Sequence, residues 1–259
     1  MRDIRLRGTM SEGSRGRVVA IIQARMGSTR LPGKTLVEVR DIPILGHVVT
    51  RTRAAKAIDA TVVATTNLPE DDAIERFCIR LDVPCYRGDS EDVLNRYLKA
   101  IDRFKADVVV RITADCPLID PSVIDIVVQA RRAMGAQYAS NGQVRSWPRG
   151  LDVETFEAST LREASRYVRK GYEREHVTPA IYEHPDRFRC VNVEAPPDER
   201  APDLRVCVDT KEDLEVVRAV AASVPNPTEI RAAYIVSFLR KHPEIASINR
   251  ATRQKQIGE

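Results

Sequence analysis

The chain has 259 residues, 43% of them hydrophobic and 30% charged, with a net charge of +4. These are ordinary values for a globular protein, and they exclude disordered and fibrous chains. No apolar run approaches the roughly 18–20 residues of a membrane span, and no block of basic residues is interleaved with aromatic ones. We therefore expect a cytoplasmic protein without a membrane or nucleic-acid partner.

The ends of the chain and its cysteines limit the organisation further. Residues 1–16 contain arginines but lack the apolar stretch of a secretory signal, so we predict a flexible leader. One domain over residues 17–245 and a C-terminal tail over 246–259 are expected. The five cysteines are an odd number without a Cys-x-x-Cys pair, which argues against a disulfide framework and a structural zinc site.

The first apolar run, residues 18–22, predicts a buried strand, and a loop rich in glycine and cations follows it. Gly27 and Gly33 allow positive φ angles and close approach of backbone N–H groups to a ligand. Arg25, Arg30 and Lys34 add three cations within ten residues. This combination predicts a polyphosphate-binding loop, and the alternative is a solvated basic loop after an edge strand.

Strands and helices then alternate, as hydrophobic periodicity indicates. Nearly continuous apolar strands suit a parallel sheet that is buried on both faces. We therefore predict an α/β fold with a doubly wound, mostly parallel, Rossmann-like sheet, whose ligands gather at the carboxyl ends of the strands. The predicted strands are 60–66, 83–86, 107–113 and 137–140, and the predicted helices are 44–56, 70–81, 90–105 (started by Ser90) and 121–134.

From residue 141 the pattern is looser, and residues 141–190 are predicted to be an insertion that covers a site. A strand over 151–156 and helices over 160–170 and 173–183 are expected within it. Two further strands and two helices are predicted to close the chain. These are strands 187–194 and 205–208 and helices 211–223 and 228–239.

Two acidic turns each place an aspartate after a predicted strand. Asp115 follows the strand 107–113, and Asp209 follows the strand 205–208. If both strands belong to one sheet, the two carboxylates converge, and such a pair can hold Mg²⁺, which takes its other ligands from water and substrate phosphates. The alternative for Asp209 is that it only caps the helix that follows it.

Several motifs together resemble the cytidylyltransferases that activate 3-deoxy-ulosonic acids, and the closest likeness is to the branch called spore coat polysaccharide biosynthesis protein F. The resemblance implies the fold of the nucleotide-diphospho-sugar transferases. The motifs are QARMGSTRLPGK (23–34), ATT (64–66), DCPL (115–118), GLDVE (150–154), REHVTP (174–179) and VDTKEDL (208–214).

The resemblance implies roles for residues of these motifs. Arg25 and Lys34 would hold the phosphates of CTP, and Asp115 and Asp209 would bind Mg²⁺, which makes these four the expected catalytic residues. A homodimer is implied as well. Further CTP contacts are implied at Ala24, Gly27, Ser28 and Arg30 in the loop, and at Thr66, Asn67, Asp92 and Arg96 on the nucleoside side.

The sugar side is predicted around residues 174–176. Arg174, Glu175 and His176 are placed there because a cation can meet the carboxylate of an acidic sugar, although a single histidine on a helix is often structural. Glu154 is assigned to the same pocket, with an exposed strand residue as the alternative. The octulosonate enzymes usually have Gly-Asp-Glu-Pro where this chain has a cysteine at position 116.

The expected function is the transfer of CMP from CTP to an acidic, sialic-like or other nonulosonic sugar, with release of pyrophosphate, for surface polysaccharide or glycan biosynthesis. Charge develops on the phosphates during this transfer, so fixed cations and Mg²⁺ are needed there. The alternatives are a glycosyltransferase that consumes a nucleotide sugar, a nucleotidyltransferase acting on a sugar-1-phosphate, and a non-catalytic nucleotide-sensing partner.

Overall fold

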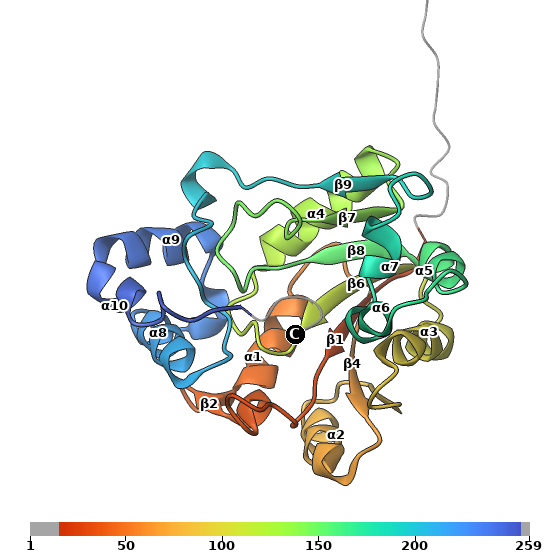
Figure 1. Cartoon of the computed structure of the whole chain (residues 1–259). Coiled ribbons are helices and arrows are strands. Elements are labelled where there is room, and N and C mark those ends of the chain that lie inside the picture. Colours follow the sequence, from red (N-terminus) through yellow and green to blue (C-terminus); the bar gives the residue numbers. More distant parts are fainter. Residues whose placement is uncertain (1–15, 255–259) are drawn as a thin grey trace, which may run out of the picture.

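A computed structural model describes residues 16–254, and its centre is a seven-stranded sheet (Figure 1). The predicted leader, except Gly16, and the last five residues of the predicted tail lie outside the described residues. In sheet order, the strands are β5 (Cys85–Gly88), β4 (Ala60–Thr66), β1 (Val18–Gln23), β6 (Val108–Thr113), β8 (Glu154–Glu157), β7 (Tyr138–Ser140) and β9 (Cys190–Asn192).

The sheet is mostly parallel, which confirms the predicted fold class. Strand β1 pairs in parallel with β4 and β6, and β4 pairs in parallel with β5, whereas β8 runs antiparallel to both β6 and β7. The chain winds outward from β1 to β5 and then returns to place β6 on the other side of β1. This reversal of strand order creates a crevice at the carboxyl ends of β1 and β6, where such sheets bind ligands.

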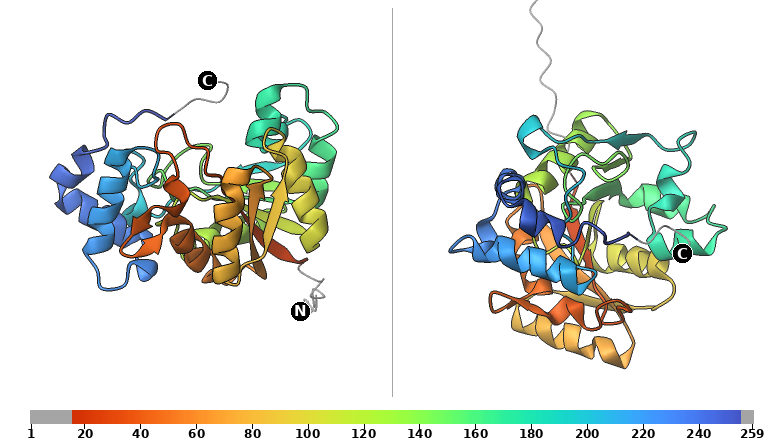
Figure 2. Two further views of the ribbon diagram at one scale, coloured as in Figure 1. Left: turned by 90° about the horizontal axis from the view of Figure 1, so that it is seen from below. Right: turned by 60° about the vertical axis from the view of Figure 1, so that its left-hand side comes forward.

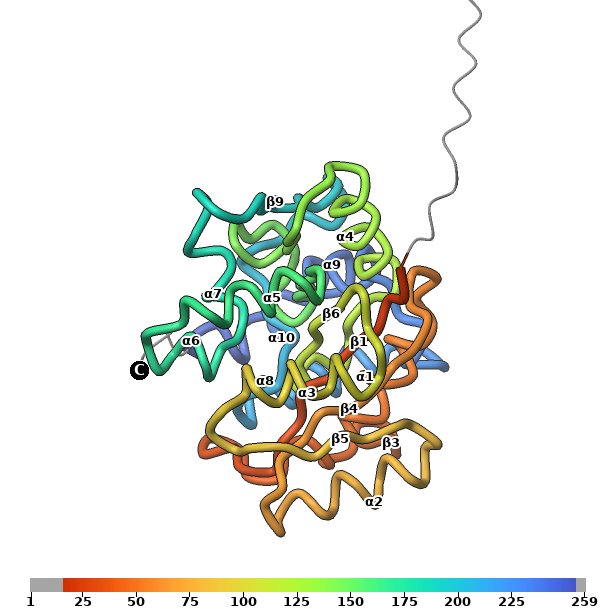
Figure 3. Tube along the Cα trace, turned by 90° about the vertical axis from the view of Figure 1, so that its right-hand side faces the viewer, coloured from red at the N-terminus to blue at the C-terminus, as the bar shows by residue number. Residues whose placement is uncertain are grey.

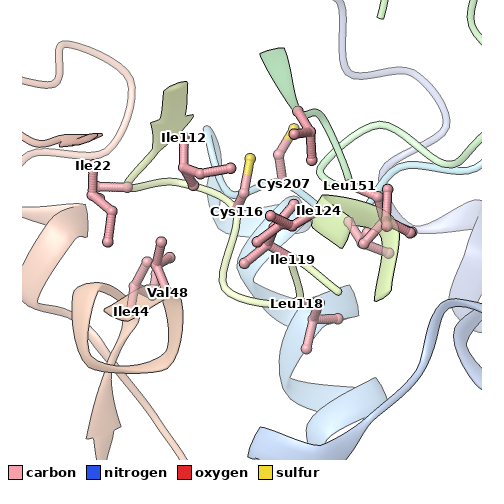
Figure 4. Close-up of a cluster of buried hydrophobic side chains, with 14 of the residues drawn as sticks. Ile22, Ile44, Val48, Ile112, Cys116, Leu118, Ile119, Ile124, Leu151 and Cys207 are labelled. Carbon is pink, nitrogen blue, oxygen red and sulfur yellow. The ribbon is translucent and has the colours of Figure 1, made fainter. Parts of the chain in front are cut away.

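Strand β1 is buried on both faces because its side chains alternate between two hydrophobic clusters. Val18, Ala20 and Ile22 pack in one cluster, and Val19 and Ile21 pack in the other. Figure 4 shows part of the first cluster around Ile22, and Figure 3 shows α3 over the other face of β1. The first cluster includes α1 (Ile44–Arg53), α2 (Asp72–Arg80), α4 (Pro121–Ala133), α8 (Lys211–Ala222) and α9 (Ala232–Lys241). The second includes α3 (Val93–Phe104), α5 (Ala158–Ala164) and α7 (Pro179–Tyr182).

The remaining elements are short. Strands β2 (Glu38–Val39) and β3 (Ile42–Pro43) form a hairpin that the sequence analysis did not predict. Figures 1 and 2 show helices α8, α9 and α10 on the opposite side of the molecule from α5 to α7. None of the helices within residues 16–254 is long and apolar enough to cross a membrane. The other elements are α6 (Gly171–His176), α10 (Pro243–Ser247) and the 3₁₀ turns η1 (Lys34–Leu36), η2 (Pro69–Asp71), η3 (Pro197–Glu199) and η4 (Pro227–Glu229).

Several predicted boundaries are wrong. Helix α3 begins at Val93 rather than near Ser90, because Asp92 is the N-cap and accepts a hydrogen bond of 3.0 Å from the Asn95 N–H. The predicted helix 160–170 ends at residue 164, and the predicted helix 173–183 is divided into α6 and α7. The division lies at Val177, whose φ angle of 70° cannot continue a helix, and Pro179 then starts α7.

Candidate active site

The loop after β1 is closed by its own hydrogen bonds. Thr35 Oγ1 donates to the Arg25 carbonyl at 2.7 Å, and the Gly33 N–H donates to the Met26 carbonyl at 3.2 Å. Gly33 has a φ angle of 70°, a left-handed conformation that glycine adopts without a steric penalty. The loop therefore has a defined shape that places Lys34 at the start of η1.

The Lys34 side chain lies between the two predicted metal-binding aspartates. Its Nζ atom is 3.1 Å from Asp115 Oδ2 and 2.8 Å from Asp209 Oδ1, and it also donates to the Val208 carbonyl at 2.7 Å. Arg30 reaches the other oxygen of Asp209, with Nη2 at 3.0 Å from Oδ2. The structure thus brings together two cations of the loop and the two acidic turns.

Asp115 is held at the carboxyl end of β6, next to β1. The Ala114 N–H donates to the Gln23 carbonyl at 2.9 Å, and Thr113 Oγ1 donates to Asp115 Oδ1 at 2.6 Å. Burial alone would raise the pKa of Asp115, but the Lys34 ammonium and the Thr113 hydroxyl outweigh it and lower the pKa to about 2. Asp115 is therefore a carboxylate at neutral pH.

Asp209 does not follow a strand, so the predicted strand 205–208 is wrong. This segment makes only a single bridge, between Arg205 and Arg149, because it lies beside a loop rather than a partner strand. It reaches the site through the Val208 N–H, which donates to the Asp115 carbonyl at 2.8 Å. The helix-cap alternative for Asp209 is also wrong, since Thr210 is the N-cap of α8.

Asp209 is held in place by a buried ion-pair network that the sequence analysis did not predict. Arg205 Nη2 is 2.7 Å from Asp209 Oδ2, and Arg205 Nε is 2.7 Å from Asp213 Oδ1. Asp213 is completely buried and also accepts a hydrogen bond of 2.8 Å from Asn249 Nδ2. These partners leave the Asp209 carboxylate little freedom to move.

Three cavities surround these residues, and we name them by their walls. The loop cavity is lined by residues of the loop after β1 together with Asp115 and Asp209, the α3 cavity by the start of α3, and the insertion cavity by residues of 140–182 with Arg111 and Thr113. They adjoin one another because His176 lines all three. The carboxyl ends of β1 and β6 therefore open into one extended cleft.

The residues predicted to contact CTP divide between these cavities. Asp92 and Arg96 line the α3 cavity, but Thr66 and Asn67 line none of the three. The Thr66 side chain is buried and donates to Asp71, and the Asn67 N–H donates to the Gly88 carbonyl at 2.9 Å. The predicted CTP contacts that line the loop cavity are Ala24, Arg25, Gly27, Ser28, Arg30 and Lys34.

The residues predicted for the sugar side are also separated. Arg174 pairs with Asp92, and it lines the α3 cavity together with Glu175. Glu154 lines the insertion cavity, and His176 lines all three cavities. Burial of His176 lowers the pKa of its imidazole, so this side chain is neutral at pH 7.

Glu154 is not an exposed strand residue. One of its oxygens accepts hydrogen bonds of 2.6 Å from both the Tyr138 hydroxyl and the Thr178 hydroxyl, and the other pairs with Arg111. Its carboxylate is therefore fully engaged within the protein. Sequence reasoning did not assign Arg111, Arg145, Arg149 or Asp152 to the site, although they line the same cavity.

This geometry agrees with a family-wide comparison. The family model described as "Cytidylyltransferase" matches residues 19–239, which include the loop after β1, both aspartates and the insertion. The chain belongs to the cytidylyltransferase family. The recognition from sequence motifs is thereby confirmed.

Two full-length relatives support this assignment. The chain is similar to the spore coat polysaccharide biosynthesis protein SpsF of Bacillus subtilis, with 35% identity over 89% of this chain and 97% of that protein. A solved cytidylyltransferase from Leptospira borgpetersenii superposes with a TM-score of 0.84 at 32% identity, covering 93% of this chain and 99% of the other.

More distant relatives share part of the chain or only the fold. The 3-deoxy-manno-octulosonate cytidylyltransferase of Geobacter sulfurreducens is 35% identical over 42% of each chain. A CMP:2-keto-3-deoxy-manno-octonic acid synthetase complexed with CTP has a TM-score of 0.59 at 20% identity, covering 80% of this cytidylyltransferase and 99% of that chain. This last similarity shows the fold alone.

Proposed function

We propose that this cytidylyltransferase transfers CMP from CTP to a hydroxyl of an acidic 3-deoxy-ulosonic or nonulosonic sugar and releases pyrophosphate, for surface polysaccharide or glycan synthesis. The observation that carries the proposal is the placement of Lys34 between Asp115 and Asp209, beside the insertion cavity, which five charged side chains line. A 3-deoxy-manno-octulosonate cytidylyltransferase is among the partial relatives.

The loop after β1 is the proposed binding site for the triphosphate. Arg25, Arg30 and Lys34 line the loop cavity together with Ser28. Negative charge grows on the α-phosphate and on the departing pyrophosphate during transfer, and fixed cations stabilise this charge best when they are already in place. We assign the base and ribose of CTP to the α3 cavity, beside Asp92 and Arg96.

The two aspartates fit a Mg²⁺ ion. Their nearest oxygens lie 2.8 and 3.1 Å from a single cationic atom, Lys34 Nζ, so they converge on one position. Mg²⁺ commonly takes one or two carboxylates from a protein and completes its shell with water and phosphate oxygens. When bound, Mg²⁺ would polarise the phosphate and lower the pKa of the attacking hydroxyl.

The sugar is assigned to the insertion cavity. This cavity adjoins the loop cavity through Thr113 and His176, so a hydroxyl of a sugar bound there faces the phosphates. His176 is neutral at pH 7, and it can therefore accept a hydrogen bond from this hydroxyl as well as donate one. Residues 141–190 would then determine which sugar is accepted.

A pyrophosphate-release screen tests the proposal. CTP, GTP, UTP and ATP are each combined with Mg²⁺ and with a panel of 3-deoxy-manno-octulosonate, N-acetylneuraminate, neutral sugars and sugar-1-phosphates. We expect release only with CTP and an acidic sugar. Release only with a sugar-1-phosphate would overturn the proposal, and release of free nucleotide from a nucleotide sugar would favour a glycosyltransferase.

The wider organisation belongs to the same proposal. We take residues 17–245 as one nucleotidyltransferase domain, with residues 141–190 as its sugar-side insertion. A homodimer, implied by the family resemblance, and a cytoplasmic location, expected from the amino-acid sequence, both remain predictions. Light scattering coupled to size-exclusion chromatography measures the assembly, and a monomer at working concentration would contradict that part.

A further inference from the structure

The insertion cavity has one more cation than anions. Three arginines line it, Arg111, Arg145 and Arg149, together with two carboxylates, Asp152 and Glu154. Because charges in a partly closed cavity are poorly screened, the pairing of these groups determines what the cavity can bind. An excess positive charge favours an anionic ligand.

Both carboxylates already have partners within the protein. Glu154 pairs with Arg111 and accepts hydrogen bonds from two hydroxyl groups. Asp152 accepts from Arg145 Nη2 at 2.6 Å through one oxygen and from the Gly150 N–H at 2.9 Å through the other. Each carboxylate is thus paired with an arginine other than Arg149.

Arg149 is the arginine without a partner. Among residues 16–254, no group accepts a hydrogen bond from its guanidinium or forms an ion pair with it. Burial and the neighbouring guanidinium of Arg145 both lower the pKa of Arg149, and the opposing effect of the Asp152 carboxylate does not outweigh them. A guanidinium that lines a cavity without an ion-pair partner is available to an anionic ligand.

The backbone at Arg149 is held firmly, unlike that of a free surface loop. The Arg149 N–H donates to the Leu204 carbonyl at 2.9 Å, and the Val206 N–H donates to the Arg149 carbonyl at 2.7 Å. The next residue, Gly150, packs so closely that an added Cβ would lie 2.4 Å from the Cys207 backbone nitrogen. Arg149 is thereby anchored to the segment that also carries Asp209.

We propose that the Arg149 guanidinium binds the carboxylate of the sugar and selects acidic over neutral sugars. This inference rests on the proposed function, and it replaces Arg174 in that role, because Arg174 is paired with Asp92 and lines the α3 cavity. A guanidinium offers two parallel N–H donors that match a carboxylate. A bound carboxylate supplies the anion that the cavity lacks.

The test compares each acidic sugar that the screen identifies with its carboxamide, using CTP as the common substrate. For the wild-type protein, kcat/KM is expected to be much larger for the acid than for the amide. In Arg149→Met the KM for the acid should rise about 10- to 100-fold, the range expected for a lost charge-assisted hydrogen bond. The ratio of acid to amide should fall by a similar factor, with the KM for CTP unchanged.

Two further variants keep the test decisive. Arg149→Lys retains the charge but not the paired donors, so it should show an intermediate KM for the acid. Arg250→Met removes an exposed arginine of the cavity behind Arg149 and should leave all constants unchanged. CTP binding measured by calorimetry, together with thermal unfolding, reports whether each variant is folded.

The outcomes separate the two proposals. Pyrophosphate release with acidic sugars and an unchanged acid-to-amide ratio in both Arg149 variants would overturn the role of Arg149 and leave the proposed function standing. No release from the wild-type protein with any acidic sugar would overturn both. A fall of the ratio in Arg149→Met, absent from Arg250→Met, supports the inference.

Discussion

Lys34 Nζ and Asp209 Oδ1 are 2.8 Å apart, so a cation of the phosphate-binding loop and a proposed metal ligand form an ion pair. Asp115 contacts the same Nζ atom at 3.1 Å, and both carboxylates raise the pKa of Lys34 against the opposing effect of burial. The ammonium thus lies at the point where the two carboxylates converge. Lys34 and a Mg²⁺ ion would compete for this point, and a bound metal would displace the ammonium from it.

Replacement of Lys34 by methionine should separate its role as a cation for the phosphates from its ion pairs with Asp115 and Asp209. We expect kcat to fall by at least 10²-fold, because a fixed cation for the developing phosphate charge is lost. Binding of Mn²⁺ in the absence of CTP, measured by electron paramagnetic resonance, should become tighter than in the wild-type protein, since no ammonium competes for the carboxylates. Lys211→Met, which changes an exposed lysine two residues beyond Asp209, is the matched control. Unchanged Mn²⁺ binding in Lys34→Met would show that the ion pair does not oppose the metal.

The aspartates at 209 and 213 should respond differently to the same change. Asp209→Asn should abolish Mg²⁺-dependent turnover with little loss of stability, because Arg205 keeps its partner Asp213. Asp213→Asn should lower the free energy of unfolding by about 3–5 kcal/mol, since it leaves Arg205 with a broken buried pair. Urea unfolding and pyrophosphate release measure the two effects. Near-normal activity of Asp209→Asn would remove Asp209 from the proposed metal site.

Gly150→Ala should be strongly destabilising. Its φ angle is +107°, and an added Cβ would lie 2.4 Å from the Cys207 nitrogen and 2.6 Å from the Val206 carbonyl carbon, both of them backbone atoms. Strain and overpacking together should cost about 3 kcal/mol or more. Gly135→Ala is the control, because Gly135 also has a positive φ but has open space around it, and about 1 kcal/mol is expected there. Equal losses of unfolding free energy in the two variants would contradict the close contact at Gly150.

His47 should make stability depend on pH. Its Nε2 donates to the Val39 carbonyl at 2.8 Å, its Nδ1 has no partner within residues 16–254, and burial lowers the pKa of the imidazole. The unfolded chain therefore binds this proton more readily than the folded one, so the contribution to stability is complete above the unfolded pKa of about 6.5 and is lost as the pH falls below it. One proton gives a slope of at most about 1.4 kcal/mol per pH unit.

Urea unfolding between pH 5 and pH 7 measures this slope. The free energy of unfolding of the wild-type protein should rise with pH, and the rise should be smaller in His47→Gln. His176, whose pKa burial also lowers, should contribute in the same direction and accounts for part of the slope that remains. An identical slope in the wild-type protein and in His47→Gln would contradict the prediction.

The parts of the fold that sequence predicted well are those set by local periodicity. The alternation of Val18 to Ile22 between two clusters is visible as a continuous apolar run, and the loop that follows shows its glycines and cations directly. The positions of Asp115 and Asp209 near one another also followed, although Asp209 reaches the site on an irregular segment. A run such as Arg205 to Val208 has strand-like composition, but only a neighbouring strand can make it one.

The groups that sequence did not reveal depend on contacts between distant segments. Nothing local to Arg149 or Arg174 indicates that Arg174 is paired with Asp92 whereas Arg149 has no ion-pair partner among residues 16–254. The ion pair of Arg205 with Asp213 also could not be read from the sequence, because it depends on the burial of both side chains in the folded protein. The hairpin of β2 and β3 was missed because two-residue strands carry no usable periodicity.

The pair formed by Lys34 and Asp209 joins residues that are 175 positions apart in the chain. During synthesis on the ribosome, β1 and its loop emerge long before the segment that carries Asp209. A nascent chain that has reached only β7 holds the loop and Asp115 but lacks the second carboxylate and its support from Arg205. Truncated chains that end before Val208 should therefore be inactive.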